Sequence, residues 1–172
     1  DEHTYEALAE QSVMGSILVD PRCLPEVERS LKPEDFRLEA DCALYRAALA
    51  LEREGSALDP LLILDRARKL GSQVSARYAM ELMEITPTAA NVGEYIRLVR
   101  EDRLRDGLLE TAETIRAGVA SREDPAALLS AAGQRLDALA AQGSTGKLVS
   151  PNDGIMAYYR QREAVEEGDA KG

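Results

Sequence analysis

The stretch "EITPTAANVGEYIRLVRE" (residues 84–101) places a turn, two candidate helix caps and an amphipathic helix side by side. Thr86 and Thr88 can each cap a helix N-terminus, and Pro87 between them fixes the entry of the chain. We therefore expect a helix to begin near Ala89, with the choice between the two caps left open. The stretch contains no plausible catalytic set, so its role must be sought in what the helix contacts.

Apolar residues change sides along this predicted helix. The first group shares one face, at about 100° per residue, and consists of Val92, Tyr95, Ile96 and Val99. The second group shares a roughly opposite face and consists of Leu104, Leu108, Ala112, Ile115 and Val119. No Pro or turn cluster interrupts residues 100–102 between them. We interpret the segment as one long helix whose two halves contact different partners.

Residues 121–124 (SRED) predict a turn into a second long helix, with Asp124 as its cap and Pro125 at its first position. Residues 125–140 carry an apolar stripe, and the two helices together predict an antiparallel hairpin about 24 Å long. A two-helix hairpin has too little interior to be stable alone, so it must pack on the rest of the chain or on another copy. The predicted oligomer interface consists of Leu104, Leu108, Ala112, Ile115, Leu128, Leu129, Leu136 and Leu139.

The sequence pattern of residues 1–100 predicts a compact bundle of short helices. Ala and Leu supply most of the apolar content and aromatic residues make up only 4%, which favours helices over sheets. Phe36 is expected to anchor a turn at residues 32–36, and Asp59 with Pro60 starts one of the helices. The helices are expected at residues 6–18, 25–31, 41–53, 60–70 and 75–84. The predicted fold is therefore all-α, a multi-helix bundle (1–100) followed by a helical hairpin (101–141).

A linker and a further helix are expected at residues 142–172. Residues 141–149 have the composition of a flexible linker, and residues 150–153 (SPND) can restart a helix. The start of this linker helix carries four large apolar side chains, Ile155, Met156, Tyr158 and Tyr159. Because no complementary stripe is left over in this chain, we expect them to dock on another molecule.

Composition restricts the class of function. The net charge of −10 would repel nucleic acid on average, so direct binding of DNA by this chain is not expected. The two Cys do not form a disulfide framework, and His3 is the only His, which removes His-based metal sites and catalytic triads. No apolar run is long enough to span a membrane, and we expect a cytoplasmic protein.

Two sets of residues imitate functional motifs. Residues 143–147 (GSTGK) resemble a phosphate-binding loop, but Ala141 and Leu148 replace the Gly and Ser/Thr that the pattern requires. We therefore expect no nucleotide cofactor, metal or catalytic residue.

Four arginines cluster among acidic residues, and they are Arg97, Arg100, Arg103 and Arg105. This cluster fits a salt-bridged face, a partner-docking face or a nucleic-acid contact, in that order of preference.

Four segments in register resemble the N-terminal domain of DnaB-type replicative helicases. They are "EQSVMGSILVDP" (10–21), "LKPEDF" (31–36), "LYRAALALEREGSALD" (44–59) and "TPTAANVGEYIRLVRE" (86–101). The resemblance covers roughly residues 5–140. It implies a six-copy ring whose members pair through their helical hairpins, a collar on which primase docks, and a linker helix that packs on a neighbouring subunit's motor domain.

The ATP-binding motor of that family would follow residue 172, so no ATPase residue can be carried over. The predicted function is therefore an oligomerisation and primase-docking collar, with Arg97, Arg103 and Arg105 as the docking residues. Two alternatives stay open. One is another replication protein of similar build, such as the helicase-binding domain of a primase or a stand-alone phage or plasmid homologue. The other is a small helical enzyme with an unrecognised site.

Overall fold

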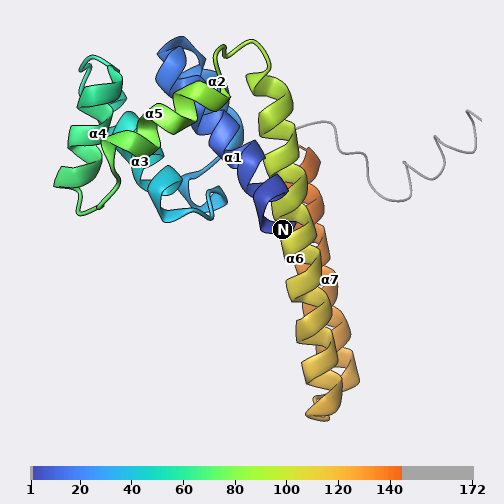
Figure 1. Ribbon diagram of the computed structural model, residues 1–172. Coiled ribbons are helices and arrows are strands. Elements are labelled where there is room, and N and C mark those ends of the chain that lie inside the picture. The colour runs from blue at the N-terminus through green and yellow to red at the C-terminus, as the bar shows by residue number, and fades with distance from the viewer. Residues whose placement is uncertain (1, 145–172) are drawn as a thin grey trace, which may run out of the picture. The chain divides into compact units, whose positions relative to one another are not determined.

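The computed structural model of the chain describes residues 2–144, and all of their regular elements are helices (Figure 1). The elements are α1 (Glu2–Val19), η1 (Pro21–Cys23), α2 (Leu24–Ser30), η2 (Pro33–Asp35), α3 (Glu39–Arg53), α4 (Pro60–Lys69), α5 (Ala76–Ile85), α6 (Val92–Ala120) and α7 (Pro125–Ser144). The predicted all-α class is confirmed. The chain divides into two compact units, the first ending at Arg103 and the second beginning at Leu104, and α6 belongs to both.

Helix α1 lies at the centre of the first unit and packs against α5 and α3. Every side chain from Val13 to Leu18 is buried, so the helix is covered on all sides rather than along one stripe. Its end at Val19, directly before Asp20 and Pro21, agrees with the sequence signal, because the residue before a proline avoids the helical region.

Helix α3 is tied to the segment before it through Tyr45. The Tyr45 hydroxyl donates a hydrogen bond of 2.8 Å to the carbonyl oxygen of Leu31, and both residues are buried. The Phe36 ring lies 4.7 Å from the Tyr45 ring between centroids, so Phe36 anchors the turn as expected. On its other side α3 packs against α4, which begins where the Asp59 carboxylate accepts the backbone N–H of Leu61 at 2.8 Å.

The loop at residues 86–91 differs from the prediction in where α6 begins and in the positions of its two threonines. Helix α6 begins at Val92 rather than near Ala89. Neither threonine occupies the expected place. Thr86 follows the last residue of α5 and is buried, whereas the Thr88 hydroxyl accepts the N–H of Ala90 at 2.9 Å within the turn. The Thr88 side chain thus stabilises the turn that precedes the helix, whereas the buried Thr86 hydroxyl has no hydrogen-bond partner among residues 2–144.

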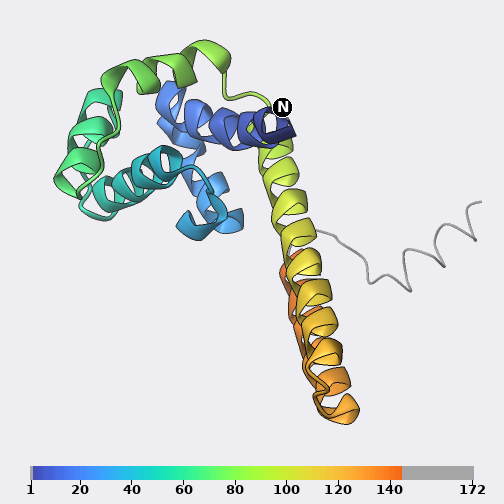
Figure 2. The same ribbon diagram turned by 60° about the horizontal axis from the view of Figure 1, so that its bottom comes forward.

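Helix α6 runs without a break through residues 100–102, as the sequence analysis predicted (Figures 1 and 2). Its first half buries Val92, Ile96 and Val99 in the core of the first unit. Helix α7 extends to Ser144, so the first residues of the expected linker are helical. The rest of the linker and the expected linker helix, with Ile155, Met156, Tyr158 and Tyr159, lie outside the described residues.

Candidate docking surface of the helical hairpin

The second unit is an antiparallel pair made of the second half of α6 and α7, and its connection is specified locally (Figure 2). Arg122 adopts a φ of 55°, and the N–H groups of Arg122 and Glu123 bond to the carbonyls of Val119 and Gly118. This pattern closes a helix C-terminus. The Asp124 carboxylate then accepts the N–H of Ala127 at 3.2 Å, which confirms the predicted cap of α7.

Small residues of α6 form the seam between the two helices. Thr111 is buried, and its hydroxyl donates a 2.7 Å hydrogen bond to the carbonyl of Gly107 one turn earlier. A Cβ atom on Gly107 would collide with the side chain of Leu139, and one on Gly118 would lie 2.7 Å from Leu128. The leucines of α7 therefore fill space that side chains on α6 would otherwise occupy, which lets the helix axes approach closely.

The predicted interface residues differ in where they point and in how exposed they are. Leu128 and Leu139 point into the seam. Leu104, Ile115 and Leu128 are partly exposed, and Leu139 is buried at 4% exposure. The remaining predicted interface residues are exposed. Together with the exposed Val119 they form a surface that we call the hairpin apolar face, which consists of Leu108, Ala112, Val119, Leu129 and Leu136.

These exposed residues lie on the same side of the hairpin. At about 100° per residue, Leu108 and Val119 stand roughly a quarter turn from the seam residues of α6. Leu129 and Leu136 stand a quarter turn from Leu128 in the same rotational sense. Read from N- to C-terminus, the exposed residues of each helix are turned about its axis by the same angle and in the same direction from the residues that face the other helix. In an antiparallel pair this places the exposed residues of both helices on the same side. The hairpin thus closes on small residues and leaves large apolar side chains in water.

A groove of about 260 Å³ runs along the seam between α6 and α7. The residues lining it are Glu110, Thr111, Thr114, Ile115, Leu128, Ala131, Ala132 and Arg135. Arg135 and Glu110 approach to 3.7 Å across the two helices. Since both partners are substantially exposed, this ion pair adds little stability and mainly defines the polar border of the groove.

The three arginines predicted to dock a partner have different surroundings. Arg97 is exposed and forms ion pairs with Glu94 at 3.1 Å and Glu101 at 2.7 Å. Arg105 is exposed as well, but Arg103 is half-buried. Burial, followed by the nearby positive charge of Arg37, lowers the pKa of Arg103. Arg97 and Arg105 are therefore accessible to a partner, whereas Arg103 contributes to the interior of the first unit.

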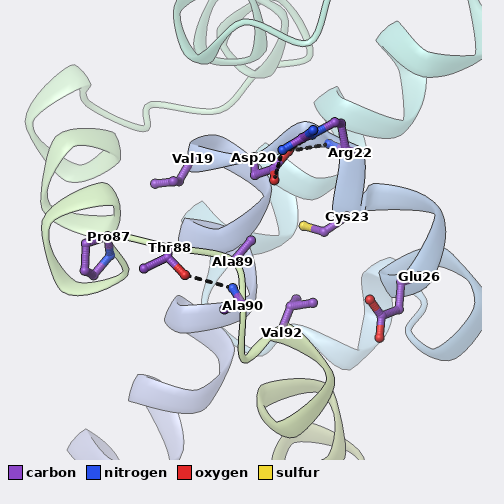
Figure 3. A pocket seen from close by; sticks show the side chains of 10 residues that line it. All are labelled: Val19, Asp20, Arg22, Cys23, Glu26, Pro87, Thr88, Ala89, Ala90 and Val92. Carbon is purple, nitrogen blue, oxygen red and sulfur yellow. Dashed lines mark hydrogen bonds and ion pairs between the residues drawn. The ribbon is translucent and has the colours of Figure 1, made fainter.

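The loop at residues 86–91 borders an open pocket of about 740 Å³ in the first unit (Figure 3). Two of its polar side chains are paired with each other, because Arg22 donates to both oxygens of Asp20 at 2.8 and 2.9 Å. Burial, with Asp20 and Glu26 nearby, raises the pKa of the Cys23 thiol to about 11. A thiol in this state is protonated at neutral pH and is not a nucleophile. The pocket therefore holds no catalytic set.

The described part of the chain offers no metal centre. Within residues 2–144 no three His, Cys, Asp or Glu side chains are grouped so that they could hold a metal ion. In the same residues no helix is both long enough and apolar enough to cross a membrane.

Comparison with known proteins identifies the fold of the first unit. The family described as DnaB-like helicase N terminal domain matches residues 2–101. The chain belongs to this family. The resemblance drawn from the four sequence segments is confirmed, and the matched region is the N-terminal domain of these helicases rather than their ATPase part.

The relatives of this DnaB-like chain include replicative DNA helicases of two bacilli named below. The chain is 29% identical to "Replicative DNA helicase DnaB" of Geobacillus stearothermophilus over 167 residues, which cover 95% of the chain and 37% of the relative. It is 29% identical to "Replicative DNA helicase DnaC" of Bacillus subtilis over 170 residues, again 95% of the chain and 37% of the relative. The chain thus spans less than half the length of these proteins.

Solved structures of DnaB N-terminal domains share the fold. The domain from Mycobacterium tuberculosis superposes with a TM-score of 0.68 at 28% identity, covering 74% of this chain and 93% of that one. The domain from Helicobacter pylori, described together with its interactions with primase, gives a TM-score of 0.60 at 21% identity over 68% of this chain and 94% of that one.

Sequence reasoning missed the seam of the hairpin, because it sought large apolar residues and passed over small ones. Gly107, Thr111 and Gly118 recur at spacings of four and seven residues, which place them on one face of α6. That spacing was the signal available in the sequence. It also missed Leu109 of α6, whose side chain is exposed.

Proposed function

We propose that this DnaB-like domain is the N-terminal collar of a replicative DNA helicase and that it self-associates through the hairpin apolar face. The exposure of that face carries the proposal, since Leu129 alone leaves 75% of its surface in water. Large apolar side chains gathered on one side of a soluble unit are typical of an interaction surface. A second hairpin with the same face is a self-complementary cover, because a two-fold interface uses the same patch on both copies.

Sedimentation of the 172-residue chain tests this self-association. We expect the wild-type chain to sediment as an oligomer and a Leu108→Asp/Leu136→Asp variant as a folded monomer. Each leucine removed from an interface costs about 1.5–3 kcal/mol of burial, so the pair should weaken association by at least about a hundredfold. Both leucines are exposed in the single chain, so its own helices should stay intact.

A matched pair of substitutions controls for added charge. Leu61 and Leu62 are exposed leucines of α4 in the first unit, and Leu61→Asp/Leu62→Asp should sediment like the wild type. A wild-type chain that stays monomeric at high concentration would refute the proposal. Equal dissociation by both double variants would show that the hairpin has no special role.

We also propose that the domain docks a primase through Arg97 and Arg105, two exposed arginines of α6. Arg97 and Arg105 provide positive charge within an otherwise acidic chain. The partner's identity is supported by the Helicobacter pylori domain, whose interactions with primase are described with its structure. Mixed charges on such a surface favour an association that weakens with salt, although less steeply than DNA binding does.

Calorimetry with the C-terminal domain of the cognate primase tests the docking role. An Arg97→Glu/Arg105→Glu variant should bind at least about tenfold more weakly and keep its helix content. Arg77→Glu serves as the control, because Arg77 makes a comparable ion pair with Glu81 four residues along a helix. Absence of any heat or co-elution with the wild-type chain would refute primase docking.

Three further parts of the proposal follow from the same assignment. The expected linker helix would pack on the motor domain of a neighbouring subunit in a six-copy ring. The chain itself would bind no DNA, because its net charge of −10 opposes contact with phosphates. A replicative helicase would also place the chain in the cytoplasm.

A further inference from the structure

Two carboxylates lie in the core of the first unit. Asp41 in α3 is 0% exposed and Glu10 in α1 is 3% exposed. Acidic side chains are almost never buried to this degree unless a cation or several hydrogen bonds compensate their charge. Neither carboxylate belongs to the hairpin apolar face or pairs with the exposed Arg97, so the burial of the two groups requires a separate explanation.

Asp41 has only part of the compensation that a buried charge needs. Its Oδ1 atom accepts a 2.6 Å hydrogen bond from the hydroxyl of Tyr78, and that hydroxyl accepts one of 3.2 Å from the Gln11 side chain. Its Oδ2 atom is buried and has no hydrogen-bond partner among residues 2–144. The hydrogen bonds join α3, α5 and α1, so the state of this carboxyl bears directly on how the three helices pack.

Glu10 is compensated much better than Asp41. Its carboxylate accepts the N–H of Leu38 at 2.9 Å and a second backbone N–H from Arg37. The positive charges of Arg37, in the loop before α3, and Arg103, in α6, also face Glu10. Burial still raises the pKa of Glu10, but these two N–H groups and two positive charges oppose the rise, and Asp41 has no comparable set of partners.

Two groups face Asp41 and act in opposite directions, because Glu10 favours its neutral form and the hydrogen bond from Tyr78 favours its charged form. They are the uncharged Tyr78 from α5 and the negative Glu10 from α1. The position of Asp41 in the first turn of α3 favours a negative charge, but a helix terminus compensates much less than full burial removes. Burial, opposed by the Tyr78 hydrogen bond and reinforced by Glu10, raises the pKa of Asp41 to about 7.

We propose that Asp41 is a proton-binding site that couples the packing of α1, α3 and α5 to pH near neutrality. In the folded chain the protonated carboxyl avoids a buried negative charge beside Glu10. Loss of the proton leaves that charge in the core without a cation of its own. The packing of α1, α3 and α5 against one another therefore weakens when the pH rises above neutrality. The hairpin is unaffected, because its contacts involve none of these groups.

The direction of the pH dependence follows from proton linkage. The pKa of Asp41 is higher in the folded chain than the value of roughly 3.9 expected for an unfolded Asp. The stabilising effect is therefore complete below the unfolded pKa and is lost as the pH rises through about 7. Between those two values one extra proton is held by the folded chain, so the unfolding equilibrium constant rises roughly tenfold per pH unit.

Urea unfolding of the 172-residue chain between about pH 5 and about pH 7 tests this inference. The wild-type unfolding constant should rise by up to roughly a hundredfold over this range, and Asp41→Asn should remove most of that rise. Asp65→Asn is the matched control, because Asp65 is exposed on α4 and pairs with Lys69 at 2.8 Å. The control should follow the wild-type profile. Parallel profiles for Asp41→Asn and the wild type would overturn the proposal.

A direct titration decides the question even if Asp41→Asn does not fold. The carboxyl carbon resonances of the wild-type chain report each proton separately. The Asp41 resonance should titrate with a midpoint near 7. A midpoint below about 5, or a neutral-range titration that belongs to Glu10 while Asp41 stays charged, would overturn the assignment.

Discussion

The seam of the hairpin predicts a strong coupling between Gly107 and Leu139. Leu139→Ala removes a side chain that is 4% exposed, and such truncations cost about 2–5 kcal/mol of the free energy of unfolding. We expect about 3 kcal/mol or more at this site. The reason is that the neighbouring Gly107 has no side chain that could move into the vacated space.

The reverse substitution should behave differently alone and in combination. Gly107→Ala places a Cβ atom against Leu139, and overpacking of this kind costs about 1–3 kcal/mol. An alanine in a helix interior gains about 1 kcal/mol over glycine, so the single variant should be only mildly destabilised. In the Leu139→Ala background the new methyl group meets no leucine. The double variant should therefore be more stable than the sum of the singles by about 1–2 kcal/mol.

Urea unfolding followed by circular dichroism, with amide exchange at the hairpin, measures this cycle. Leu129→Ala is the matched control, because Leu129 is 75% exposed and its truncation in the monomer should cost no more than about 0.5 kcal/mol. The measurement belongs at a concentration where the chain does not associate. Effects of the two seam substitutions that add within about 0.3 kcal/mol would refute the packing described here. A Leu129→Ala effect as large as that of Leu139→Ala would refute the division into inward and outward leucines.

Two further predictions concern the first unit. Tyr45→Phe should lower the free energy of unfolding by about 1–2 kcal/mol, because it leaves the buried carbonyl of Leu31 without its donor; an unchanged urea midpoint would contradict this. In a Cys42→Ser background, Cys23 should react with iodoacetamide at about pH 8 roughly a hundredfold more slowly than an unshifted thiol, since burial raises its pKa to about 11. The rate should rise with pH towards that value, and rapid alkylation at neutral pH would contradict the prediction.

Sequence signals that depend on near neighbours in the chain determined much of the architecture. The cap at Asp59, the turn before Asp124 and the end of α1 before Pro21 were all predictable, because each requires only a few adjacent residues. The continuity of α6 followed from the absence of a breaker, and the family followed from four segments in register.

Tertiary structure alone decided which side chains meet. Leu129 and Leu139 have the same chemistry on one helix, yet the rotation of α7 about its axis buries only Leu139. That rotation depends on the small residues of α6, which periodicity of large apolar residues does not reveal. Asp41 and Tyr78 lie 37 residues apart, and no local pattern pairs them. Helical periodicity is set within a few turns of the chain, whereas burial and protonation depend on groups that come together only after the helices pack.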